Sequence, residues 1–146
     1  MSPDAATERP ILYISGPYSP GYGRTVEDNI RIAREYATRA WNRGWAAITP
    51  HLNTAGFELD CTDLRHEDWL AGDLSILSHL DPARSAVLML PRWKQSKGAR
   101  LEFKEACKRG FPVYFSTDIL GGVPRTPAPG TRCPDGKTCP ARREAR

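Results

Sequence analysis

The stretch Ser85-Ala86-Val87-Leu88-Met89-Leu90 is the most apolar run of the chain, and Pro91 ends it. A short, continuous apolar run bounded by a residue that breaks regular structure is typical of a strand buried on both faces. We therefore predict that residues 85–90 form the central strand of the fold.

Apolar runs and amphipathic segments alternate on both sides of this strand. The predicted strands cover residues 11–14, 45–49, 85–90 and 112–116, and the predicted helices extend from Thr25 to Gly44, from 64 to 79 and from 99 to 109. Such alternation is typical of the α/β class, in which helices cover both faces of a parallel sheet. We predict a single doubly wound, flavodoxin/Rossmann-like parallel sheet of four to five strands.

The helix that begins at Thr25 has the clearest local signals. Thr25 is expected to cap it, and Glu27 and Asp28 complement the positive end of the helix dipole. The apolar positions at helical spacing, which predict its buried face, are Val26, Ile30, Ala33, Ala37 and Trp41. Residues 51–63 have no clear period, so we expect a loop there.

The 146 residues fit one domain. We place this domain at residues 10–123, after an N-terminal leader (1–9) and before an irregular tail (124–146) rich in Pro, Gly and Arg. The tail holds six basic and two acidic residues and so accounts for the net charge of +4, whereas residues 1–123 hold 15 of each sign. A basic stripe on the domain is not supported, and we expect no nucleic-acid partner.

No segment approaches the roughly 20 apolar residues of a membrane helix, and the polar N-terminus lacks an apolar signal-peptide region. We therefore expect a cytoplasmic protein without a membrane partner, whose cysteines are reduced thiols. Cys133 and Cys139 are interpreted as two thiols in the tail, with a disulfide or a zinc ion shared between subunits as open alternatives. His51, His66 and His79 are not spaced as metal ligands, and we interpret each as a loop or surface residue.

Ligands of open parallel sheets bind beyond the carboxyl ends of the strands, so functional residues are expected in the loops 15–24, 50–63 and 91–98. The first loop is rich in glycine and leads into a helix, where backbone amides can hold an anion, and Gly16 can adopt a positive φ. Its sequence GPYSPGYG matches neither the dinucleotide-binding nor the Walker motif. A plain strand-to-helix turn explains it equally well.

Two carboxyl groups near this edge are candidates for chemistry. Glu102, at the start of the helix after the central strand, would be kept ionised at neutral pH by the helix dipole and could act as a nucleophile. Asp73, among leucines on the preceding helix, would have a raised pKa suited to a general acid. The alternatives stay open: Ser96 as a helix cap, Glu102 as a solvated acid, Asp73 as a surface residue and Tyr13 as a core residue.

Several segments together carry a family resemblance. They are ILYISGPYS at 11–19, Asn29, Thr49-Pro50-His51, DLSIL at 73–77, the strand 86–90, Pro91-Arg92-Trp93, and Ser96-x-Gly98-Ala99-x-x-Glu102. Over about residues 10–116 the chain resembles the nucleoside 2-deoxyribosyltransferase superfamily, and more narrowly its DUF4406-type branch. Deoxynucleoside 5′-monophosphate N-glycosidases belong to the same superfamily.

The resemblance implies roles for these residues. Glu102 would attack C1′ of deoxyribose and form a covalent intermediate, Asp73 would assist departure of the base by proton transfer or by orienting the sugar, and the Tyr13 hydroxyl would hold the Glu102 carboxylate. We expect Trp93 to stack on the base, with a place covering the loop or an interface as the open alternative. The implied substrate-binding set is Ser15, Gly16, Pro17, Tyr18, Trp93, Ser96 and Gly98.

Ser96 bears on the substrate, since six residues before the nucleophilic Glu the nucleoside transferases carry an acid and the 5′-monophosphate hydrolases a serine. A hydroxyl at a helix start can donate to a phosphate that an acid would repel, and Arg24 or Arg92 would add charge-assisted contacts. We therefore expect hydrolysis of the N-glycosidic bond of 2′-deoxynucleoside 5′-monophosphates. The alternatives are a nucleoside 2-deoxyribosyltransferase that exchanges bases and a non-catalytic nucleotide-binding sensor. The resemblance further implies a homodimer or larger homo-oligomer, with no cofactor or metal.

Overall fold

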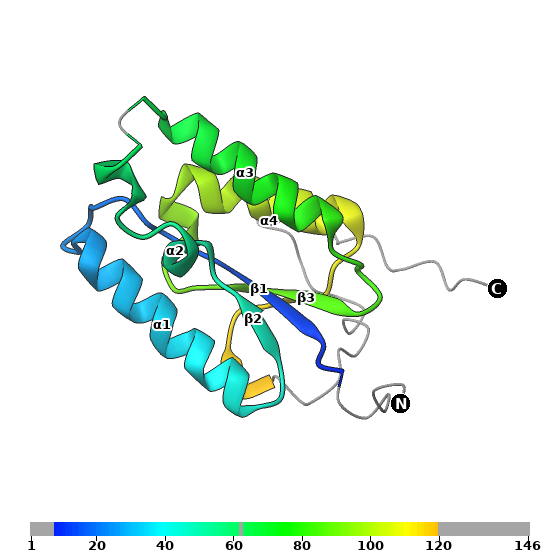
Figure 1. Cartoon of the computed structure of the whole chain (residues 1–146). Helices are drawn as coiled ribbons and strands as arrows, with labels where there is room; N and C mark the ends of the chain where they lie inside the picture. Colours follow the sequence, from blue (N-terminus) through cyan, green and yellow to red (C-terminus); the bar gives the residue numbers. More distant parts are fainter. Residues whose placement is uncertain (1–7, 62, 120–146) are drawn as a thin grey trace, which may run out of the picture.

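The computed structural model describes residues 8–61 and 63–119, which contain one parallel sheet (Figure 1). Its strands are β1 (Ile11–Ser15), β2 (Ala46–Ile48), β3 (Ser85–Met89) and β4 (Val113–Tyr114), in the spatial order β2-β1-β3-β4. β1 pairs in parallel with β3 from Ile11 opposite Ser85 to Ser15 opposite Met89. This strand order is the flavodoxin-like one, and it confirms the predicted fold class.

Helices cover both faces of the sheet. They are α1 (Val26–Asn42), α2 (Pro50–Asn53), α3 (His66–His79) and α4 (Lys97–Arg109), with short 3-10 turns at Phe57–Leu59, Trp93–Gln95 and Thr117–Ile119. α1 lies against one face, and α3 and α4 lie against the other (Figure 1). None of the helices in the described part of the chain combines the length and apolarity needed to cross a membrane.

The two-residue period of β1 divides its side chains between two apolar layers. Leu12 and Ile14 pack with α1, whereas Tyr13 packs with Leu77 of α3 and Phe103 of α4. The fully buried β3 contributes to both layers, as its apolar sequence predicted. The face that holds Tyr13 is therefore the one on which α3 and α4 meet the sheet.

The predicted buried face of α1 is wrong in part. Trp41 is 48% exposed, because the helix turns Asn29 and Ala40 toward the sheet together with Ala33. The guanidinium of Arg9 lies over the Trp41 ring, 5.5 Å from its centroid, and donates to the Trp41 carbonyl oxygen at 2.9 Å. Small side chains on the buried face bring the α1 backbone close to the sheet, which leaves no room for an indole there.

The expected loop at residues 51–63 is also wrong in part. Pro50 begins the short helix α2, since its fixed φ suits the first turn of a helix, and a 3-10 turn follows at Phe57–Leu59. α4 begins at Lys97, two residues before the prediction, because the Ser96 hydroxyl accepts from the Ala99 amide at 3.2 Å and caps the helix. Most of the predicted leader, the predicted tail, Cys133 and Cys139 lie outside the described residues.

Candidate active site

The carboxylate of Glu102 is the centre of the polar site. Glu102 lies on α4 and is only 6% exposed. The Tyr13 hydroxyl donates to its Oε1 at 3.1 Å, and the Ser15 hydroxyl donates to its Oε2. Because Tyr13 and Ser15 are two residues apart on β1, the strand period places both hydroxyls on the same face, toward this one carboxylate.

Burial raises the pKa of Glu102 to about 7, and the negative charge of Asp73 raises it further, against the opposing effect of the two hydroxyl donors. The expectation that the helix dipole keeps Glu102 ionised is therefore wrong. Glu102 is the sixth residue of α4, beyond the first turn in which the dipole acts, and desolvation dominates. Both the protonated and the ionised form of Glu102 are therefore available near neutral pH.

Asp73 is half-buried on α3, and burial raises its pKa to about 6, although the nearby charge of His66 lowers it. The predicted raised pKa is confirmed. Burial and the charges of Glu102 and Asp73 also raise the pKa of Tyr13, so its hydroxyl keeps its proton and remains a donor. The Tyr13 hydroxyl lies 3.4 Å from the Asp73 carbonyl oxygen, which links β1 to α3 beside Glu102.

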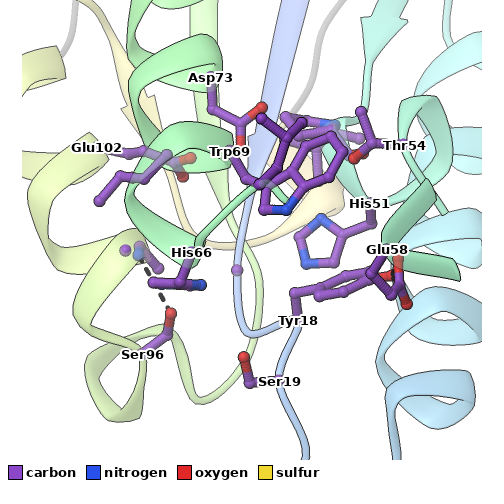
Figure 2. Close-up of a pocket in the computed structure, with 17 residues that line it drawn as sticks. Tyr18, Ser19, His51, Thr54, Glu58, His66, Trp69, Asp73, Ser96 and Glu102 are labelled. Atoms are coloured by element: carbon purple, nitrogen blue, oxygen red, sulfur yellow. Dashed lines mark hydrogen bonds between the residues drawn. The ribbon is translucent and has the colours of Figure 1, made fainter. Parts of the chain in front are cut away.

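Both carboxyl groups line a cavity of about 330 Å³ at the carboxyl end of β1 (Figure 2). Of the predicted site residues, Gly16, Tyr18, Asp73, Ser96, Gly98 and Glu102 lie on its wall. The other polar or aromatic lining residues include His51, Thr54, Glu58, His66 and Trp69. The cavity thus joins residues from the loop after β1, the α2 region, α3 and the start of α4.

The loop after β1 is held in place on three sides. A Cβ atom at Gly16 would lie 2.6 Å from the Leu90 Cβ, so glycine is needed there for close packing and not, as we expected, for a positive φ. The buried Asn29 amide donates to the carbonyl oxygens of Tyr18 and Ser19, each at 3.1 Å. The Tyr18 hydroxyl donates to Glu58 at 3.0 Å and so connects the loop to the segment after α2.

A second cavity of about 340 Å³ adjoins the first. The two share Tyr18, Ser19, His66, Ser96 and Gly98 in their walls. Among the described residues, the second cavity is lined by Arg24, Arg92 and Lys97 and by no carboxylate, whereas Glu58, Asp73 and Glu102 line the first. The site therefore has an acidic part and a basic part side by side.

The family model described as "Domain of unknown function (DUF7768)" matches residues 10–116, which include every residue of both cavity walls. The chain belongs to this family. No curated protein and no solved structure matches the chain significantly. The description of the DUF7768 family assigns no activity.

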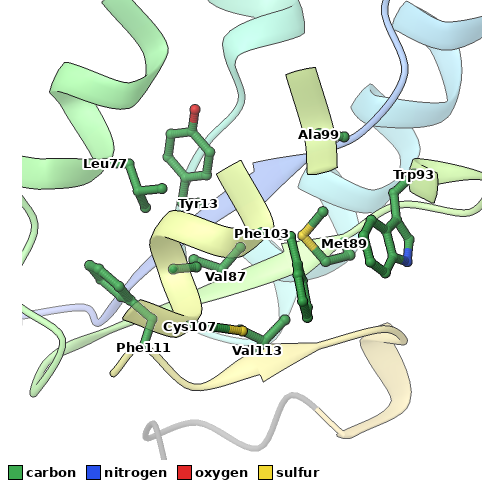
Figure 3. Packing of buried hydrophobic residues seen from close by; sticks show 11 residues of the cluster. Tyr13, Leu77, Val87, Met89, Trp93, Ala99, Phe103, Cys107, Phe111 and Val113 are labelled. Atoms are coloured by element: carbon green, nitrogen blue, oxygen red, sulfur yellow. The ribbon is translucent and has the colours of Figure 1, made fainter. Parts of the chain in front are cut away.

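Three predicted substrate-binding residues have other positions in this DUF7768 domain. Trp93 lines neither cavity: it is 7% exposed, and its ring stacks on Phe103 at 4.6 Å between centroids (Figure 3). It packs in the core because the 3-10 turn at Trp93–Gln95 directs the indole toward α4. Ser15 is buried with its hydroxyl on Glu102, and Pro17 lines the second cavity.

Sequence reasoning missed the indole and the two histidines that line the cavity. His66, Trp69, Leu70 and Asp73 lie at i, i+3, i+4 and i+7 of α3, so the spacing from Asp73 could have identified them. His51 is not a loop or surface residue: it is 5% exposed, and its Nε2 lies 2.8 Å from the Pro17 carbonyl oxygen. Burial lowers the pKa of His51, which favours the neutral ring that donates to Pro17.

Proposed function

We propose that this domain hydrolyses the N-glycosidic bond of 2′-deoxynucleoside 5′-monophosphates through a covalent deoxyribosyl-Glu102 intermediate. The observation that carries the proposal is the Glu102 carboxylate, which is buried on a cavity wall, held by the hydroxyls of Tyr13 and Ser15, and accompanied by a second carboxyl group with a raised pKa. Two carboxyl groups with separate roles are what a retaining glycosidase requires.

In the first step, a Glu102 oxygen forms a bond to C1′ while the bond from C1′ to the base nitrogen breaks. The electron pair of the broken bond stays on the base, and the protonated Asp73 supplies a proton to it. In the second step, water attacks C1′, Asp73 takes up a proton from the water, and the Glu102 carboxylate is released. Tyr13 and Ser15 orient the nucleophile, because each holds one of its oxygens.

The cations that line the second cavity favour a substrate that carries a phosphate group. Ser96 caps α4 at the boundary of the two cavities, and Arg24, Arg92 and Lys97 line the basic part. An anion there would neutralise these cations and lie beside the amino end of a helix. A 5′-phosphate on this side and C1′ beside Glu102 would place a deoxynucleotide across both cavities.

The test is chromatography of the free base released from a panel of 2′-deoxynucleosides and their 5′-monophosphates, with and without a second base as acceptor. We expect base release from monophosphates without an acceptor. Release only when an acceptor is present would identify a deoxyribosyltransferase in place of a hydrolase. Binding without turnover on every panel member would overturn the catalytic proposal in favour of a nucleotide-binding module.

The pH dependence of the reaction is expected to depend on both carboxyl groups. The reactive form has Glu102 ionised, with a pKa of about 7, and Asp73 protonated, with a pKa of about 6, so kcat/KM is greatest between these two values and falls on both sides. In Asp73→Asn the alkaline limb should disappear, because the group that has to stay protonated is gone, whereas the acidic limb, which reports the ionisation of Glu102, should remain.

Measuring kcat/KM against pH for both proteins checks this expectation. Glu67→Gln is the matched control, since Glu67 is an exposed carboxylate on the same helix and does not line the cavity. Its profile should follow that of the unmodified protein. An alkaline limb that persists in Asp73→Asn would contradict the assignment of Asp73 as the general acid.

A further inference from the structure

The second cavity is larger than one phosphate group requires. Its volume of about 340 Å³ nearly equals that of the first cavity, which the proposed function fills with a whole deoxynucleoside. A volume of roughly 300 Å³ or more is that of a small-molecule site. A single phosphate at Ser96 would leave the part of the cavity around Tyr22, Arg24 and Arg92 empty.

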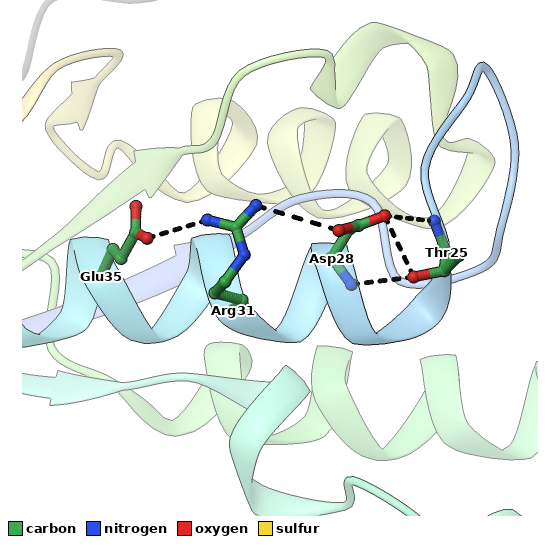
Figure 4. A network of polar contacts seen from close by, with 4 residues as sticks. All are labelled: Thr25, Asp28, Arg31 and Glu35. Atoms are coloured by element: carbon green, nitrogen blue, oxygen red, sulfur yellow. Dashed lines mark hydrogen bonds and ion pairs between the residues drawn. The ribbon is translucent and has the colours of Figure 1, made fainter.

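Of the three arginine and lysine side chains that line this cavity, two have unoccupied donors. Among the described residues, no side-chain hydrogen bond or ion pair is made by Arg24 or Lys97. Asp28 attracts Arg24 electrostatically, but its carboxylate is taken up by the Thr25 amide at 2.9 Å, the Thr25 hydroxyl at 3.0 Å and Arg31 at 3.9 Å (Figure 4). The donors of Arg24 therefore remain available to an anionic ligand.

Part of the cavity wall is a tight turn with an uncommon backbone conformation. Gly21 and Arg24 exchange two hydrogen bonds of 3.0 Å around a tight turn, in which Tyr22 has a φ of 54° and Gly23 a φ of 78°. Arg92, the other non-glycine residue with a positive φ in the described part of the chain, donates from Nη1 to the Tyr22 carbonyl oxygen at 2.8 Å. The loops after β1 and β3 are thus joined, and Arg92 lines the cavity with guanidinium donors beyond the one that Tyr22 occupies.

We propose that the second cavity binds a chain of phosphates, so that the preferred ligand of the site is a 2′-deoxynucleoside 5′-di- or triphosphate. The inference rests on the proposed function for the position of the nucleoside and extends its substrate class. The phosphate nearest the sugar lies at Ser96, beside the amino end of α4, and the following phosphates reach the cluster of Arg24, Arg92 and Lys97. Each added phosphate brings negative charge to a wall that holds cations and, in its described residues, no carboxylate.

The experiment is a calorimetric affinity series on the full chain. The Glu102→Gln variant binds 2′-deoxyadenosine and its 5′-mono-, di- and triphosphate, so that affinity is measured without turnover. We expect the affinity to increase by about tenfold for each added phosphate. An affinity for the triphosphate no higher than that for the monophosphate would overturn the proposal.

Single substitutions test which cations bind the phosphates. Lys97→Gln and Arg24→Gln, each in the Glu102→Gln background, are expected to weaken triphosphate binding about tenfold and to leave nucleoside binding unchanged. Arg34→Gln is the matched control, because Arg34 is exposed on α1 and lines neither cavity. Equal losses for nucleoside and triphosphate would indicate a general disturbance of the site and overturn the assignment of these side chains.

The affinity series and the base-release assay together distinguish a failure of this proposal from a failure of the proposed function. Base release from the monophosphate without a gain in affinity for the triphosphate would support the hydrolase and overturn the polyphosphate site. An affinity that increases with each added phosphate, without base release from any of these ligands, would support the polyphosphate site and overturn the hydrolase. A 5′-phosphorylated single-stranded oligonucleotide that binds more tightly than the triphosphate would overturn the proposal in favour of a nucleic-acid end.

Discussion

Glu102→Gln is expected to lower the rate of base release from deoxynucleoside 5′-monophosphates by about 10⁴-fold or more, as is usual when a covalent nucleophile is removed. The amide keeps the size of the side chain and can still accept from Tyr13 or Ser15, but it cannot form the bond to C1′. Substrate binding should be largely retained, so the loss should appear in kcat and leave KM nearly unchanged. Chromatography of the released base, at a pH between 6 and 7, measures both quantities.

The control for this variant is Glu105→Gln, three residues later on α4. Glu105 is paired with Arg109 at 2.5 Å, away from both cavities, and the loss of a partly exposed ion pair has little effect. Glu105→Gln should therefore keep nearly full activity. If Glu102→Gln retained a tenth or more of the activity of the unmodified protein, Glu102 would not be the nucleophile.

The Glu102→Gln substitution is also expected to stabilise the protein at alkaline pH. Folding raises the pKa of Glu102 from 4.5 to about 7, and this costs the folded state about 3 kcal/mol once the carboxyl is ionised in both states. Because the folded pKa lies above the unfolded one, the stability contributed by the protonated carboxyl is fully present below pH 4.5 and is lost as the pH rises through 7. At pH 8, Glu102→Gln should be more stable than the unmodified protein by about 2 kcal/mol, since the buried amide recovers only part of this cost.

Urea unfolding at pH 5 and pH 8 measures this difference. The free energy of unfolding of Glu102→Gln, relative to the unmodified protein, should increase between the two pH values. Glu105→Gln should follow the unmodified protein at both. A difference that does not change with pH would show that the Glu102 carboxyl keeps the same pKa on folding.

If Glu102→Gln increases the stability and abolishes the activity, then the charge of Glu102 lowers the stability of the fold and is needed for the reaction. A polar group that destabilises the fold is expected at a functional site, where strain or desolvation serves the chemistry. The stability and the activity of Glu102→Gln are informative together, because replacing a buried carboxylate that has no function by glutamine would cause no loss of activity.

The local pattern of the sequence was sufficient to predict the sheet and the approximate positions of the main helices. The apolar run at residues 85–90 was predicted to be a strand, and its residues 85–89 form β3, because a sheet covered on both faces buries every side chain of such a run. Thr25 and Gly110 mark helix ends through their own hydrogen bonds and backbone preferences, which need no distant partner. The placement of Glu102, Asp73 and Ser96 at one edge follows from this topology, since parallel strands end at the same side.

What the tertiary structure alone decided is how each side chain is surrounded. The pKa of Glu102 depends on desolvation and on a charge from another helix, neither of which its own neighbours in the sequence reveal. Trp93 became a core residue and Trp69 a cavity residue, because the turn before α4 and the exposed face of α3 direct the two indoles differently. The basic cavity joins Arg24 and Arg92 across 68 residues of sequence, and no local pattern encodes such a contact. Periodicity and caps act within a few residues, whereas burial and charge depend on segments that only folding brings together.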